Sequence, residues 1–90
     1  MNLNRLISFT SVHHAIRAER LLTEAAIKVM PLPTPREISI SCGQCLLFNA
    51  DCQQEALAIL KKAGVHWSKL FSRDASGKVY EKLADYKGEP

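Results

Sequence analysis

Strand-like and helix-like stretches alternate along this chain in a regular order, and few small folds accommodate that order. Four short runs carry the apolar and β-forming residues of strands: Arg5–Thr10, Ile27–Leu32, Gln44–Phe48 and Val65–Ser72. Apolar residues on both faces of the first run indicate a central strand, whereas Pro31 indicates that the second lies at a sheet edge. The fourth run alternates only loosely, and we expect it at an edge as well.

Two amphipathic segments separate these strands. Ser11 is expected to cap the first helix, Val12–Ala26, which carries apolar residues at helical spacing along one side. That stripe consists of Val12, Ala15, Ala18, Leu22 and Ala25. Asp51 is expected to cap the second helix, which Gly64 ends.

The order strand, helix, strand, strand, helix, strand predicts an α+β fold: a ferredoxin-like βαββαβ two-layer sandwich, with an antiparallel sheet and two helices on one face. Ninety residues form one domain with a thin core and no deep substrate cavity. We expect this domain to span residues 1–73. Residues 74–90 are expected to be a polar C-terminal tail or a short helix, because Val79, Leu83 and Tyr86 have helical spacing.

Composition excludes several functional classes. A net charge of +3 and 7% aromatic residues are too little for a nucleic-acid-binding surface. No stretch of about 18 apolar residues, which a membrane span would need, is present. The N-terminal residues also lack the apolar core of a secretion signal, and the three cysteines are an odd number. We therefore expect a cytoplasmic protein with reduced thiols and no cofactor.

The three cysteines have different surroundings in the sequence. Cys42 and Cys45 form a C-x-x-C motif, but a strand pattern follows it, whereas a thioredoxin-type pair needs a helix there. A zinc site would have to join both to Cys52 and to His13 or His14, and the second short ligand pair typical of zinc is missing. Both alternatives stay open. Packing in the sheet is the simpler interpretation for Cys45, and packing on a helix for Cys52.

Cys42 is the best candidate for chemistry. It ends the long irregular stretch Pro33–Gly43, and Gly43 lets a partner approach the backbone closely. Positive charge nearby would favour its thiolate, and His13, His14, Arg17 and Arg36 are the available groups.

These residues resemble those of a small bacterial family described as selenium/sulfur carrier-like proteins. The resemblance covers about Ile7 to Phe71. It rests on Phe9-Thr10-Ser11, His14-Ala15, Ala18-Glu19 and Leu22, on Pro33-Thr34-Pro35-Arg36-Glu37-Ile38-Ser39, and on Cys42-Gly43. This chain departs from the family pattern at Gln44 and Cys45, where small or apolar residues are usual, and at Ala26, where glycine is usual.

The resemblance implies a carrier that holds sulfur or selenium on Cys42 as a persulfide or selenopersulfide, at most a sulfurtransferase-like activity. The expected binding residues are Pro35, Arg36, Glu37, Gly43, His13 and His14. The implied partners are a protein donor such as a cysteine desulfurase and an acceptor enzyme, with a homodimer left open. The alternative is a non-enzymatic regulatory or assembly module that binds an anion or a protein through the start of the first helix and the Pro33–Ser39 loop.

Overall fold

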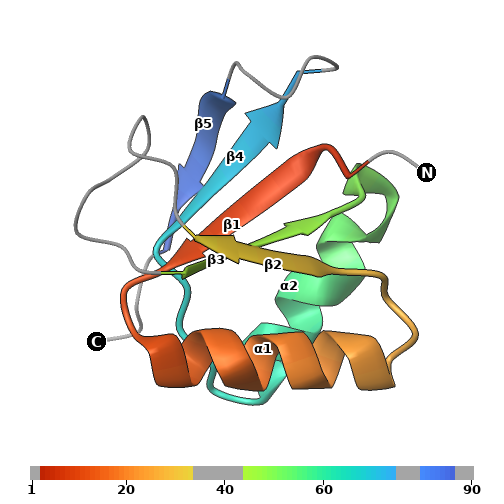
Figure 1. The fold of residues 1–90 in the computed structure, drawn as a ribbon. Coiled ribbons are helices and arrows are strands. Elements are labelled where there is room, and N and C mark those ends of the chain that lie inside the picture. The colour runs from red at the N-terminus through yellow and green to blue at the C-terminus, as the bar shows by residue number, and fades with distance from the viewer. Residues whose placement is uncertain (1–2, 34–43, 75–79, 87–90) are drawn as a thin grey trace.

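The computed structural model describes residues 3–33, 44–74 and 80–86 (Figure 1). In chain order the elements are β1 (Arg5–Phe9), α1 (Val12–Glu24), β2 (Met30–Pro33), β3 (Gln44–Phe48), a 3-10 turn η1 (Ala50–Cys52), α2 (Gln53–Lys62), β4 (Lys69–Arg73) and β5 (Tyr80–Asp85). The strands form one sheet in the order β2-β3-β1-β4-β5, and every neighbouring pair is antiparallel.

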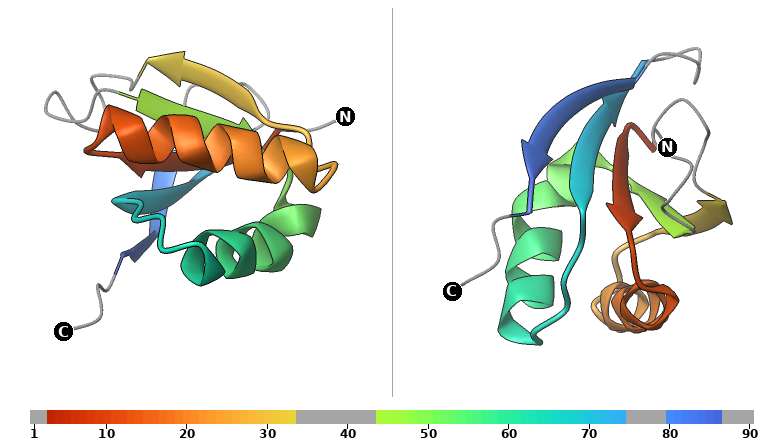
Figure 2. Two further views of the ribbon diagram at one scale, coloured as in Figure 1. Left: turned by 90° about the horizontal axis from the view of Figure 1, so that it is seen from below. Right: turned by 90° about the vertical axis from the view of Figure 1, so that its left-hand side faces the viewer.

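The predicted α+β fold is confirmed. The first four strands have the ferredoxin-like order, in which β3 lies between β1 and β2. Both helices lie on one face of the sheet (Figure 2). The structure adds a fifth strand outside β4.

The central strands β1 and β3 are buried on both of their faces. Toward the helices, Ile7, Phe9, Leu46 and Phe48 belong to the main core, which also contains the buried residues of α1 and α2. On the other face, Leu6 and Cys45 are fully buried in a second cluster with Leu47 and Phe71; Leu3, Leu32 and Tyr80 pack against it. This confirms the prediction of a doubly covered first strand.

Helix α1 begins at the predicted cap. The Ser11 hydroxyl accepts a hydrogen bond from the His14 amide at 3.5 Å, which satisfies one of the unpaired amides of the first turn. Ala15, Ala18 and Leu22 are buried as expected, but Val12 is 50% exposed, so the prediction of a buried Val12 is wrong. The exposed Ile16 lies one turn further along α1.

Helix α2 starts later than the sequence pattern indicates. Asp51 does not cap it; Asn49 instead accepts from the Asp51 amide at 2.7 Å and opens the 3-10 turn η1. Cys52 is then the N-cap residue of α2 and makes no side-chain capping bond. Asn4 fixes this turn to the start of β1, since its side chain accepts from the Ala50 amide at 2.8 Å.

Both helices end in the same hydrogen-bonded motif. In α1 the amides of Ala26 and Ile27 bond to the carbonyls of Thr23 and Leu22, at 3.0 and 2.9 Å, which is the Schellman pattern. In α2 the amides of Gly64 and Val65 bond in the same way, to Lys61 and Leu60. The residue that must adopt a positive φ is Gly64 (72°) in α2 and Ala26 (64°) in α1.

Two prolines close the outer edge of β2, which is an edge strand as predicted. The bond from the Arg73 amide to the Asn4 carbonyl shows that even-numbered residues of β1 bond toward β4, so the odd-numbered ones bond toward β3. By the register, Met30 and Leu32 then bond to β3. Pro31 and Pro33 face outward, where their missing N–H groups leave no ladder bond unmade.

The C-terminal part differs from the expectation of a polar tail or a short helix over 74–90, because Tyr80–Asp85 is strand β5. It pairs with β4 through a bulge at Leu70/Phe71, and Ala84 packs against the main core. The expected edge position of the fourth strand is therefore wrong. The segment has too few apolar residues for their spacing to distinguish a strand from a helix, so the sequence pattern did not reveal β5.

Replacing Ala26 with glycine should stabilise the protein by about 1 kcal/mol, because a side chain in the left-handed region is strained there. Gly64→Ala is the matched control: a methyl group at Gly64 meets no atom within 4 Å, so backbone strain alone should destabilise it by a similar amount. Urea unfolding would measure both. A midpoint that falls for Ala26→Gly would contradict this account of the helix end.

The ion pairs of Asp85 should make the stability of β5 depend on pH. Its carboxylate accepts a hydrogen bond from Lys82 at 3.0 Å and lies 3.5 Å from Lys69; these contacts, Lys82 first, hold the pKa of Asp85 below its ordinary value of 3.8 despite some desolvation. The stabilisation is thus complete above pH 3.8 and disappears as the pH falls through the lower pKa of the folded state. Urea unfolding of the wild type and Asp85→Asn should differ at neutral pH and converge in acid; a constant difference would contradict the assignment.

Candidate functional site

Three connections meet at one end of the sheet, which we call the site end. The β1–α1 connection leaves there after Phe9, whose register partner is Gln44, the first residue of β3. Gln44 also pairs with Pro33, the last residue of β2, so the β2–β3 connection departs from and returns to the same end (Figure 1). The α2–β4 connection arrives there too, because Ser68 donates to the Ser8 carbonyl at 2.6 Å.

His14 is the predicted site residue with the most defined geometry. It lies in the first turn of α1, half-buried, and its Nδ1 accepts a hydrogen bond from the His66 backbone amide at 2.8 Å. The two imidazole rings also stack, with centroids 5.1 Å apart and planes 17° from parallel. The α2–β4 connection therefore holds the His14 ring through both its backbone and a side chain.

The stack continues into the C-terminal segment. The ring of Tyr86 stacks on that of His66, with centroids 5.2 Å apart, and meets the ring of Trp67 edge-on at 5.4 Å. Tyr86 is fixed to the same connection by its amide, which donates to the Ser68 carbonyl at 2.9 Å. The site end thus carries a cluster of four rings, which we call the ring stack: His14, His66, Tyr86 and Trp67.

The other predicted site residues divide into two groups. His13 is exposed beside His14, and the Arg17 guanidinium donates to the Ala63 carbonyl at the end of α2, at 3.3 Å. The remaining predicted site residues lie outside the described residues: Cys42, Gly43, Pro35, Arg36 and Glu37.

The other two cysteines lie on opposite faces of the sheet. Cys45 is fully buried in the second cluster, between its register partners Ser8 of β1 and Leu32 of β2, which confirms its packing role. Cys52 is half-buried and packs against the helix-side core. Because the sheet separates them, these two thiols do not ligate a common metal ion.

The geometry of the ring stack argues against metal binding by its two histidines. The lone pairs of the two rings lie in separate, nearly parallel planes, and the Nδ1 of His14 already accepts a hydrogen bond from the His66 amide. Within residues 3–33, 44–74 and 80–86, no three His, Cys, Asp or Glu side chains gather as metal ligands would. In the same part of the chain, neither helix is long and apolar enough to span a membrane.

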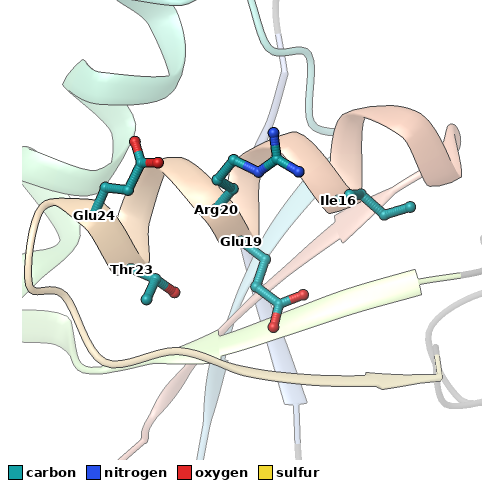
Figure 3. A pocket seen from close by; sticks show the side chains of 5 residues that line it. All are labelled: Ile16, Glu19, Arg20, Thr23 and Glu24. Carbon is teal, nitrogen blue, oxygen red and sulfur yellow. The ribbon is translucent and has the colours of Figure 1, made fainter.

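A shallow hollow on the outer side of α1 is a poor candidate for a site (Figure 3). Its walls are Ile16, Glu19, Arg20, Thr23 and Glu24, all from this one helix. Carboxylates and a guanidinium alternate along it, and it is open to solvent. The arrangement is that of a solvated helix face.

Three residues of the ring stack, His66, Trp67 and Tyr86, are not among the site residues predicted from the sequence. His66 lies in the connection before β4 and matches no motif. The predicted topology could have indicated its role, because a βαββαβ fold brings that connection beside the start of α1. The position of Tyr86 could not be predicted in this way, because it depends on β5, which the sequence pattern did not indicate.

Comparison with family models places the chain in a described family. The family described as "Putative Se/S carrier protein-like" matches residues 4–72, which contain β1 to β3, both helices and all of β4 except its last residue. Comparisons with curated proteins and with solved structures found no significant match. Strand β5 and Tyr86 lie beyond the matched region.

The two described cysteines should differ strongly in reactivity toward an alkylating agent. Cys45 is fully buried and becomes accessible only when the sheet opens, so we expect it to react on the order of 100-fold or more slowly than the half-buried Cys52. Mass spectrometry of peptides after timed alkylation would measure both rates, with urea-unfolded protein as the control. Equal rates in the folded protein would show that the second face of the sheet is not closed.

Proposed function

Because the chain belongs to the Se/S carrier protein-like family, we propose that it carries sulfur or selenium on Cys42 and passes it between partner enzymes. One observation carries the proposal: Gln44, the start of α1 and His14 all lie at the site end. Neighbouring Cα atoms lie 3.8 Å apart, so the chain tethers Cys42 within about 7.6 Å of the Gln44 Cα. The start of α1 lies three residues after Phe9, the register partner of Gln44.

The chemistry requires one nucleophilic thiolate and no resident cofactor. The Cys42 thiolate attacks the outer sulfur of a cysteine persulfide on the donor, an S–S bond forms at Cys42, and the donor's S–S bond breaks. The donor cysteine leaves as a thiolate and takes up a proton. Attack by an acceptor's thiolate on the outer sulfur of Cys42 reverses these changes, so no oxidant or reductant is consumed.

The surroundings proposed for Cys42 favour the thiolate and admit a partner. Arg36 supplies positive charge, and hydrogen bonds from His14 and the unpaired amides at the start of α1 stabilise an anion. Gly43 leaves space for the donor's loop beside the thiol. A domain of 90 residues with a thin core fits a protein that brings its thiol to the active sites of larger enzymes.

Incubation with a cysteine desulfurase and cysteine should add one sulfur atom to the protein, detected by intact-mass spectrometry. Cys42→Ser should abolish the addition, because Cys45 is fully buried in the sheet and Cys52 packs against the helix-side core. Cys45→Ala and Cys52→Ala are the matched controls and should retain it.

Loading that persists in Cys42→Ser, or that is lost in Cys45→Ala while that variant stays folded, would overturn the assignment of Cys42. The same assay with a selenium donor compares the two elements. If Cys42 accepts neither while the protein still binds an anion or a protein partner, the regulatory-module alternative is the correct one.

A further inference from the structure

The hydrogen bond to His14 determines where the proton of its ring lies. The donor is the His66 backbone amide, so the accepting Nδ1 carries a lone pair and no proton. The neutral ring then has its proton on Nε2, and no group within the described residues accepts a hydrogen bond from that atom. In this arrangement His14 is a neutral N–H donor and not the cation that the sequence suggests.

The ring stack fixes the orientation in which this donor is presented. The stack of His66 on His14 leaves the His14 plane little freedom to rotate, and the His66 ring is itself stacked with Tyr86. The His66 side chain is exposed, so its two ring contacts are the main interactions that fix its orientation. Tyr86 therefore acts on His14 through His66.

Tyr86 reaches this position through an element that the family match does not include. Pairing of β5 with β4, together with the Lys69–Asp85 and Lys82–Asp85 ion pairs, brings the chain back to the site end. The amide of Tyr86 then bonds to the Ser68 carbonyl. The family match ends at residue 72, before β5 begins.

We propose that β5 and Tyr86 form a positioning element, which with His66 locks His14 as a neutral Nε2–H donor at the site end. This inference rests on the proposed function, in which the acceptor is the sulfur or selenium anion on Cys42. A donor of fixed direction stabilises that anion without the reorganisation that a free imidazole would need. His66 and Tyr86 are thus positioning residues for this chain's own version of the carrier.

The test measures the imidazole of His14 directly, by its nitrogen chemical shifts in ¹⁵N-labelled protein at neutral pH without any donor present. The wild type should show mainly the neutral tautomer with the proton on Nε2. Tyr86→Ala and His66→Ala both keep the backbone amide of residue 66, but without the full stack the His14 ring can rotate away from this amide, so both variants should show a mixture of tautomers. Tyr86→Phe retains the ring and should behave as the wild type.

The same four proteins are then compared in the rate of persulfide loading. Tyr86→Ala and His66→Ala should load about two- to tenfold more slowly, the range expected for the loss of one ring pair, while Tyr86→Phe loads normally. Far-ultraviolet circular dichroism confirms that each variant is folded.

Each outcome bears on a different part of the inference. An unchanged His14 tautomer in Tyr86→Ala, or a mixture of tautomers in Tyr86→Phe, overturns the positioning role. A changed tautomer with an unchanged loading rate shows that the ring stack is structural only, and also overturns it. Failure of the proposed function is seen separately, as the absence of loading on Cys42 in the wild type, and leaves the tautomer measurement intact.

Discussion

Burial of β1 and β3 on both faces is the constraint on which the rest of the structure depends. One face is covered by the two helices, which is the usual arrangement for a two-layer fold. The other face carries Leu6, Cys45 and Leu47, nearly or fully buried although neither helix lies there. Phe71 and Tyr80 from the C-terminal half help to cover it, so β5 contributes to the second face as well as to the sheet. A thiol at position 45 is consequently a packing residue.

Much of the fold could be predicted because its signals are local. The apolar run Gln44–Phe48 has the same bounds as β3, because Gly43 and Asn49 delimit it in the sequence. Ser11 caps α1, as its side chain indicates. The misplaced cap of α2 shows the limit: Asn49 and Asp51 are both good caps, and only the bond between Asn4 and the Ala50 amide selects the 3-10 turn. Strand β5 was not predicted because its residues are polar and mostly exposed and its pairing with β4 contains a bulge.

The candidate site could be predicted only in part, for a related reason. His14 was identified from its place at the start of a helix, which is a local feature. Its partner His66 lies 52 residues away in the chain, and the contact exists only because two connections meet at one end of the sheet. The same contact changes the chemistry expected of His14, from a positive charge to a directed N–H group. Sequence patterns give the type of residue at such a site, whereas the fold gives its hydrogen-bond partner and its orientation.

The prolines of β2 have a consequence for how this domain can grow. Met30 and Leu32 bond inward to β3, and Pro31 and Pro33 offer no N–H outward, so a further strand beside Met30–Pro33 would find no backbone donors to pair with. At the opposite side, β4 has full backbone capacity on its outer edge. Additional chain can therefore extend this sheet in one direction, and β5 lies on that side. The same direction leads back to the site end, so a strand added to the sheet brings the chain that follows it into contact with the connection that holds His14.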